Sequence, residues 1–135
     1  MNPMFAFDLQ GKKGLVLGLA NEHSIAWGCA RQAQAMGAEV VASCLNEKAR
    51  PFVEPLTQPL GMDLQTCNIE TPEELENLVA YAVAKFGRLD FVIHSIAWAP
   101  LADLHGRVID SSSTGFARAM EVSCHSFATL AKLCA

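Results

Sequence analysis

The sequence predicts an α/β fold built on a doubly wound parallel sheet, and two observations lead to this prediction. Short apolar runs rich in β-branched residues alternate along the chain with segments whose apolar residues recur at helical spacing. The composition, 51% hydrophobic and 18% charged over 135 residues, is typical of a globular domain that buries its own core. We therefore expect residues 1–135 to form a single domain.

The first two strands and the helix between them are predicted from the pattern of apolar residues. Lys13–Leu19 is almost continuously apolar, as in a strand that is covered on both faces. Ser24–Met36 carries apolar residues at helical spacing, and Gly37 follows it as a natural end to the helix. Glu39–Cys44 is rich enough in β-branched residues to form the second strand.

The segment after the second strand is expected to be irregular. Residues 47–60 contain Pro51 and Pro55, which restrict any helix there to short, interrupted turns because proline lacks the N–H donor. Met62–Ile69 then predicts a third, weaker strand.

The clearest local signal is the start of a helix at Thr71. Thr71 is the predicted N-cap, Pro72 takes the first helical position, and Glu74 completes a Thr-x-x-Glu capping box. Gly87 ends the helix. Its inner face is expected to consist of apolar residues at helical spacing: Leu75, Leu78, Val79, Ala82, Val83 and Phe86.

A strand, a loop and a long helix complete the predicted order. Leu89–Ser95 predicts the fourth strand, 96–110 a loop, and Thr114–Ala135 a helix capped by one of the serines at 111–113. The inner side of this helix is expected to carry Phe116, Met120, Phe127 and Leu130.

Composition and charge exclude several classes of function. The net charge is −4, and the scattered basic residues form no surface for nucleic acid or an anionic membrane. Met1–Asp8 has no basic segment before an apolar stretch, and no apolar run is long enough to span a bilayer. Five cysteines without a Cys-x-x-Cys pair indicate a reducing cytoplasm, and no histidine has metal-ligand spacing. We therefore expect a cytoplasmic protein without a metal.

The turn after the first strand has the residues that a diphosphate needs, at the carboxyl end where such sheets bind ligands. Gly18 and Ala20 permit close approach, and Ser24–Ala26 begins a helix whose N–H groups and dipole attract an anion. The Gly-x-Gly-x-x-Gly fingerprint is absent. An ordinary turn with Ser24 as the cap is therefore an open alternative.

The turns after the second and third strands are less specific. Leu45 offers neither a carboxylate for an adenosine ribose nor a cation for a 2′-phosphate. Glu47 and Lys48 are interpreted as the start of a solvated helix, so these residues specify the choice of cofactor poorly. Asn68 has an amide that can meet the edge of an adenine, or it simply turns the chain.

Two further features are interpreted as structural. Tyr81 and Lys85 match a Tyr-x-x-x-Lys pair in which the lysine lowers the phenol pKa, but they lie within the predicted third helix, away from the carboxyl ends. His94 ends an apolar strand and is interpreted as a packed imidazole.

The chain resembles the bacterial enoyl-acyl-carrier-protein reductases of the short-chain dehydrogenase superfamily in two motifs, Gly18 with Ser24–Ala26 and the run His94–Pro100. The similarity covers essentially the whole chain. The resemblance implies a Rossmann-type domain that binds a nicotinamide dinucleotide. It also implies reduction of the trans-2 double bond of an enoyl thioester on acyl carrier protein, during fatty-acid elongation.

Carried over by position, the resemblance implies a diphosphate surrounded by Gly18, Ser24 and Ile25, and an acyl group near Ala99. The family commonly has Gln at position 45 and Asp at position 68, so an adenosine hydrogen bond is lost or rebuilt. The absence of a basic pair at positions 45 and 46 favours NADH over NADPH. The full set of expected cofactor contacts is Gly18, Ala20, Ser24, Ile25, Leu45, Asn68, Ile69, Ser95 and Ile96.

The resemblance places the family's catalytic Tyr and Lys, spaced Tyr-x6-Lys, beyond Ala135. We therefore expect no catalytic residue in these 135 residues and a dinucleotide-binding domain truncated after the fourth strand and the following long helix. The exposed outer edge of that strand favours a homo-oligomer. The alternative is a catalytically inactive fragment that binds a nucleotide or mediates oligomerisation.

Overall fold

The computed structural model describes residues 7–135, which divide into two compact units between Ser95 and Ile96. The expectation about Met1–Asp8 falls mainly on residues 1–6, which lie outside the described residues. A single domain over the whole chain stays a prediction.

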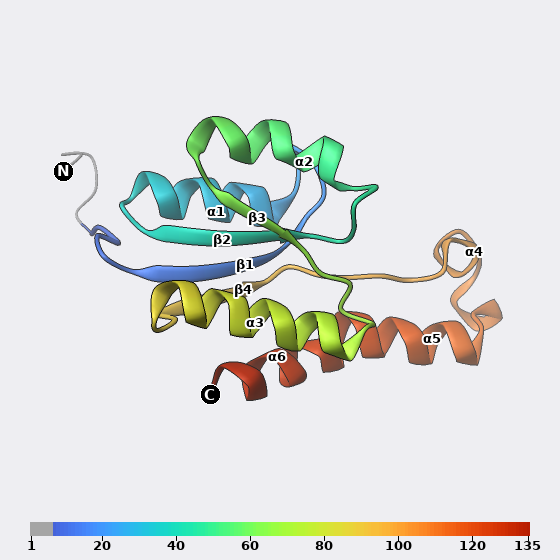
Figure 1. Cartoon of the computed structure of the whole chain (residues 1–135). Helices are drawn as coiled ribbons and strands as arrows, with labels where there is room; N and C mark the ends of the chain where they lie inside the picture. The colour runs from blue at the N-terminus through green and yellow to red at the C-terminus, as the bar shows by residue number, and fades with distance from the viewer. Residues whose placement is uncertain (1–6) are drawn as a thin grey trace. The chain divides into compact units, whose positions relative to one another are not determined.

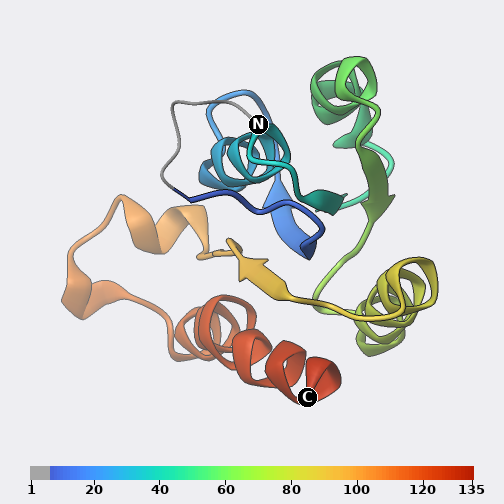
Figure 2. The same ribbon diagram turned by 90° about the vertical axis from the view of Figure 1, so that its left-hand side faces the viewer.

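The first unit is a parallel sheet of four strands in the order β3-β2-β1-β4 (Figure 1). Helices α1 and α3 lie on opposite faces of this sheet, so it is doubly wound (Figure 2). This order is that of the first half of a Rossmann sheet and confirms the predicted fold class. The elements are β1 (Lys13–Leu19), α1 (Ile25–Ala35), β2 (Glu39–Cys44), α2 (Arg50–Thr57), η1 (Gln58–Leu60), β3 (Asp63–Thr66), α3 (Pro72–Phe86) and β4 (Phe91–His94).

The two inner strands coincide with the predicted segments because they are buried on both faces. In β1, Val16 packs in one cluster with Ala26 and Ala30 of α1, while its neighbours Leu15 and Leu17 are also fully buried. The outer strands β3 and β4 are shorter than predicted, since each pairs with only one neighbour in this order.

The prediction that residues 47–60 form only interrupted turns is wrong for α2, which runs continuously from Arg50 to Thr57. Pro51 lies in the first turn, where its missing N–H has no partner to lose. Pro55 lies inside the helix and removes a single intrahelical hydrogen bond. Burial of Val53 and Thr57 offsets that loss.

Helix α3 begins at the predicted residue but without the predicted capping box. Thr71 is the N-cap, yet its side chain makes no cap hydrogen bond; the Glu74 N–H donates instead to the Thr71 carbonyl at 3.0 Å. The inner face is narrower than expected, because Val83 lies on the flank of the helix and is exposed. The buried residues are Leu75, Leu78, Val79 and Ala82.

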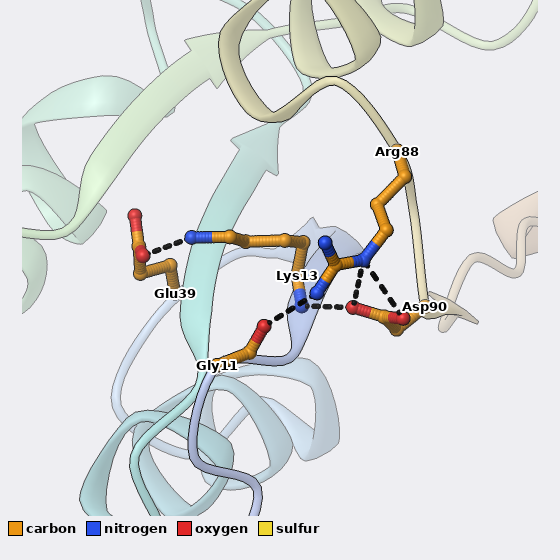
Figure 3. Close-up of polar contacts among 5 residues, drawn as sticks. All are labelled: Gly11, Lys13, Glu39, Arg88 and Asp90. Atoms are coloured by element: carbon orange, nitrogen blue, oxygen red, sulfur yellow. Dashed lines mark hydrogen bonds and ion pairs between the residues drawn. The ribbon is translucent and has the colours of Figure 1, made fainter.

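A polar network ties the amino ends of three strands together (Figure 3). Asp90, just before β4, accepts a hydrogen bond from the Lys13 N–H at 2.8 Å and from the Arg88 guanidinium at 3.2 Å. Arg88 also donates to the Gly11 carbonyl at 2.9 Å, and the Lys13 ammonium pairs with Glu39 at the start of β2. The network fixes the register at the end of the sheet opposite the predicted ligand site.

The second unit is helical. Where a loop was predicted at 96–110, the chain forms two short helical turns, because Asp103 accepts hydrogen bonds from the N–H and hydroxyl of Ser112 and ties the segment to the next helix. Ser112 is the N-cap and accepts from the Gly115 N–H at 3.1 Å, as predicted for one of the three serines. The elements are α4 (Leu101–Leu104), η2 (Val108–Asp110), α5 (Ser113–Met120), η3 (Glu121–His125) and α6 (Ser126–Cys134).

The predicted long helix contains a π-helical turn, η3, which inserts an extra residue and rotates the apolar stripe that follows it about the helix axis. The predicted inner side is wrong for Phe116 and Met120, which precede this turn, and for Phe127, which follows it, since all three are exposed. It is right for Leu130, which is buried. The buried residues are Gly115, Val122, Ser126 and Leu130.

Across residues 7–135, no helix is long and apolar enough to cross a membrane.

Candidate functional site

The site begins where β1 ends. Gly18 has φ +106°, a conformation that side chains rarely adopt, and the pairing of β1 with β2 shifts between Leu17 and Leu19 at this residue. The bulge turns the chain out of the sheet toward α1. The backbone geometry at position 18 is therefore enough to explain why a glycine stands there.

Ser24 determines how the turn between β1 and α1 is held. Its Oγ accepts hydrogen bonds from the N–H groups of Ala20 at 2.8 Å and Asn21 at 2.9 Å. The Asn21 side chain in turn accepts from the His23 N–H at 2.8 Å. The turn is thus closed by its own side chains, and Ser24 makes no side-chain cap on α1 although it occupies the N-cap position.

The first turn of α1 is consequently left without a side-chain cap. The first N–H group of α1 that has a backbone acceptor is that of Gly28, which donates to the Ser24 carbonyl at 3.1 Å. The N–H groups of Ile25, Ala26 and Trp27 have no acceptor inside the helix. Three backbone amides at the positive end of a helix dipole are typical of a site that binds an anion. Ile25 lies beside them with its side chain 77% exposed.

The other predicted positions lie at the carboxyl ends of the neighbouring strands. Leu45, 53% exposed, directly follows β2, and β2 reaches Leu19 in its pairing with β1. The Ser95 N–H donates to the Leu17 carbonyl at 3.1 Å, which holds the end of β4 beside the end of β1. The sheet thus brings Gly18, Leu45 and Ser95 to one edge.

Asn68 follows β3 at the same edge, and its side chain turns the chain. The Asn68 Oδ1 accepts from the Glu70 N–H at 3.0 Å, and the Asn68 carbonyl accepts from the Thr71 N–H at 3.0 Å. The amide oxygen therefore serves the turn, which is one of the two interpretations of this residue; contact of its amide N–H₂ with an adenine stays a prediction. Ile69 is half-buried beside it.

The remaining predicted residues, Ile96 and Ala99, belong to the second unit and are half-buried. They flank Trp98, whose backbone is held by Ser123 in the π turn. The Trp98 N–H donates to the Ser123 Oγ at 2.9 Å, and that hydroxyl donates to the Trp98 carbonyl at 3.1 Å. The Arg118 guanidinium lies 4.0 Å from the centroid of a Trp98 ring. No sequence signal marks the π turn, so this support was not predicted.

One histidine and two cysteines near this edge are held in their neutral forms by burial. Burial lowers the pKa of His94 at the end of β4, against the opposing effect of a backbone hydrogen bond, so its imidazole is neutral at pH 7. Burial raises the pKa of the Cys67 thiol to about 11 and also raises the pKa of Cys44. Neither cysteine is a thiolate nucleophile under ordinary conditions. In the part of the chain described, no cluster of His, Cys, Asp or Glu could hold a metal ion.

Tyr81 and Lys85 lie at the opposite end of the sheet, as predicted. The Tyr81 hydroxyl and the Lys85 ammonium both donate to the Asp63 Oδ2, at 2.5 and 2.6 Å, and Asp63 is the first residue of β3. Burial acts to raise the pKa of Asp63, but hydrogen bonds from Lys85, Tyr81 and Gln65 outweigh it and lower the pKa. The hydrogen bond to Asp63 raises the pKa of Tyr81, the reverse of what a proton donor needs.

Residues 18–135 match the family model described as enoyl-(acyl carrier protein) reductase. The chain belongs to this family. The match begins at the glycine of the β1 bulge and includes every residue of the candidate site. The membership confirms the resemblance drawn from Gly18, Ser24–Ala26 and His94–Pro100.

Curated relatives in the enoyl reductase family bear the same description. The chain is 37% identical over 125 residues to enoyl-[acyl-carrier-protein] reductase [NADH] 2 of Rhizobium meliloti. The matching region covers 92% of this chain and 47% of that protein. It is 36% identical over 125 residues to the corresponding NADH reductase of Aquifex aeolicus, covering 92% of this chain and 46% of that protein. The chain therefore spans about half the length of the curated relatives it matches.

Solved structures of the family share the fold. The reductase of Anaplasma phagocytophilum in complex with NAD superposes with a TM-score of 0.88 at 36% identity, covering 93% of this chain and 48% of that one. The Bacillus cereus reductase with NADP⁺ and indole naphthyridinone also gives a TM-score of 0.88, at 32% identity, covering 95% of this chain and 51% of that one.

Proposed function

We propose that this chain binds NADH at the carboxyl edge of its sheet and forms the dinucleotide-binding part of an NADH-dependent enoyl-acyl-carrier-protein reductase. The observation that carries the proposal is the uncapped start of α1. Ser24 turns its hydroxyl back onto Ala20 and Asn21, which leaves the amides of the first helical turn to an anion. The names of the NADH-dependent relatives support the same cofactor.

In this proposal each strand end contributes to one part of the dinucleotide. The diphosphate lies over Ile25 and the turn from Gly18 to Ser24, where the bulge and small residues admit it. Leu45, Asn68 and Ile69 border the adenosine, Ser95 and Ile96 face the nicotinamide ribose, and Ala99 lies near the acyl group. Leu45 has no hydrogen-bonding group, so the adenosine ribose relies on neighbouring residues.

Bound NADH would supply the hydride that reduces the trans-2 double bond of an enoyl thioester on acyl carrier protein. The residues of this chain orient the cofactor; among those described, we assign none to proton donation. Tyr81 is held on Asp63 at the far end of the sheet, and His94 is neutral. We therefore expect the purified 135-residue polypeptide to bind NADH and to oxidise none of it in the presence of an enoyl thioester.

The binding proposal is tested by placing a charge where the diphosphate would lie. Ile25→Glu puts a carboxylate at the first position of α1, where it favours the helix dipole and repels a diphosphate. Nicotinamide fluorescence should report an NADH affinity at least about tenfold weaker than that of Ile25→Gln, while the melting temperature stays equal or rises. Equal NADH affinity in the two variants, or no binding by the unaltered chain, would exclude this diphosphate site.

We also propose a cytoplasmic homo-oligomer. The residues that support it are exposed apolar side chains along α5 and α6, including Phe116, which is 64% exposed, with Met120 and Phe127. Large apolar side chains exposed in this way are typical of a surface that another chain covers. Light scattering should give a mass above that of the monomer, and Phe116→Glu should lower it, whereas Ala117→Glu at the adjacent exposed position of α5 should not.

The alternative function is oligomerisation without nucleotide binding, and the same exposed residues favour it. Combining the NADH titration with the solution mass separates the two functions. A stable oligomer whose nicotinamide fluorescence never changes would support the alternative.

A further inference from the structure

The outer side of β3 presents backbone groups that no strand pairs with. β3 lies at the edge of the sheet and pairs with β2 alone, in a register that sets Cys44 opposite Thr66 (Figure 1). The Cys67 N–H donates to the Cys44 carbonyl at 2.8 Å, so the backbone of Cys67 faces β2. Because successive residues of a parallel strand alternate in the side that their backbone groups face, Leu64 and Thr66 turn their N–H and C=O groups outward. Another chain can add a strand at such an edge.

Arg50, the first residue of α2, reaches one of these outward groups. Its Nη1 donates to the Leu64 carbonyl at 3.4 Å, and its side chain is 26% exposed. Two carboxylates hold the guanidinium in this place. The Arg50 Nε donates to the Glu47 Oε2 at 3.0 Å, and the Arg50 Nη1 lies 3.6 Å from the Glu54 Oε1. The guanidinium therefore lies against the outward side of β3, at the second of its four residues.

A guanidinium in this place opposes the addition of a strand in two ways. Paired strands lie about 4.8 Å apart, so an incoming strand needs the space that the Arg50 side chain occupies. The incoming N–H would also have to displace a charged donor from the Leu64 carbonyl. Glu47 and Glu54, which are 74% and 51% exposed, add negative charge beside the edge. The same edge of a second copy carries the same charges, so the two edges repel each other.

We propose that Arg50 protects the outer edge of β3 from pairing with the β3 strand of a second copy of this chain. Charged side chains on an edge strand are a common means of preventing such pairing. The start of the strand is held separately, since the Asp63 carboxylate accepts from Tyr81 and Lys85 of α3. The inference goes beyond the proposed function, because it holds whether or not a dinucleotide binds.

The test replaces the guanidinium of Arg50 with an apolar group. In sedimentation velocity experiments, Arg50→Met should begin to self-associate at a protein concentration at least about tenfold lower than the unaltered chain. Arg50→Lys keeps a cation at the edge and should stay within about twofold of the unaltered chain. Arg31→Met makes the same exchange at an exposed position of α1 and is the control, which should have no effect. Equal association of Arg50→Met and the unaltered chain would overturn the proposal.

A second variant separates edge pairing from unfolding. Thr66→Pro removes an outward N–H and leaves the N–H groups that face β2 in place, and proline is tolerated on edge strands. Added to Arg50→Met, it should return self-association to the level of the unaltered chain. Hydrogen exchange should show that the Leu64 and Thr66 amides gain protection when Arg50→Met associates, whereas the Cys67 amide is protected throughout.

The remaining outcomes assign any association to its source. Association of Arg50→Met that Thr66→Pro does not reverse comes from unfolding, and association that Arg31→Met shows equally comes from a general loss of charge; either result contradicts the proposal. The effect of Arg50→Met should persist when Phe116→Glu is added, because Phe116 lies on α5. Its disappearance there would assign the association to α5 and α6 and would also contradict the proposal. A chain that fails to bind NADH leaves this inference unchanged.

Discussion

Removal of the Ser24 hydroxyl should lower both the stability of the chain and its affinity for NADH. Ser24→Ala removes the acceptor of two N–H groups, those of Ala20 at 2.8 Å and Asn21 at 2.9 Å. A net hydrogen bond contributes about 0.5–1.5 kcal/mol, so the free energy of unfolding should fall by about 1–3 kcal/mol. Because Ala20 and Asn21 are exposed, water can replace the lost acceptor, and the lower half of that range is expected.

The assay is urea unfolding followed by far-ultraviolet circular dichroism. With a slope of about 1–2 kcal/mol per molar urea, the midpoint should fall by roughly 0.5–2 M at an unchanged slope. NADH affinity should fall as well, since the turn that directs α1 toward the diphosphate is no longer held. Ser24→Thr retains the hydroxyl and should recover most of both effects, and Ser113→Ala at the start of α5 is a control for loss of an exposed serine hydroxyl.

The result that would refute this reasoning is a stable Ser24→Ala chain with unchanged NADH affinity. In that case the loop would be held by its backbone alone, and the position of the α1 amides would not depend on the serine. An increase in stability would point to Ser24 acting against the helix that it precedes.

Two further predictions concern the sheet itself. Asp63→Asn should lower the free energy of unfolding by about 1–2 kcal/mol at pH 7, because the carboxylate accepts hydrogen bonds from Tyr81 and Lys85. The pKa of Asp63 is lowered in the folded protein. The carboxylate therefore contributes to stability above the unfolded pKa near 3.8, and this contribution is lost as the pH falls through the folded pKa. Urea titrations should therefore show the two proteins converging in stability at low pH, and a constant difference would contradict the assignment. Leu17→Ala, at a fully buried site in β1, should cost about 2–5 kcal/mol, and a loss under about 1 kcal/mol would mean that the β1 core is not packed as described.

The sequence predicted the strands and helices best where burial is continuous. β1 and β2 match the predicted residues because a strand covered on both faces is apolar throughout and ends where polar residues begin. The α3 boundaries were predicted by Pro72 and Gly87, the latter with φ +76°. These signals depend only on neighbouring residues, so they can be recognised from the sequence without the tertiary structure.

The errors come from features that depend on tertiary structure or on small energetic differences. Pro55 removes one hydrogen bond, and whether packing of Val53 offsets it is not visible in a local pattern. The π turn at Glu121–His125 shifts the phase of the helix after it, so an ordinary helical projection placed Phe127 inward although it is exposed. In the site, the strand ends were predictable from topology, whereas the hydrogen bonds between Ser123 and Trp98 depend on side-chain geometry.

The two ends of the sheet differ in a way that explains why only one suits a ligand. At the amino end, Asp63 and Asp90 accept from side chains and backbone of neighbouring elements, so the charged groups there already satisfy one another. At the carboxyl end, the bulge at Gly18 and the turned hydroxyl of Ser24 leave helix amides without internal acceptors. A serine at an N-cap position ordinarily stabilises the helix that it begins, by about 1 kcal/mol. The loss of that stabilisation at α1 is offset if an anion takes the place of the cap, and this is the physical reason for placing the diphosphate at the first turn of α1.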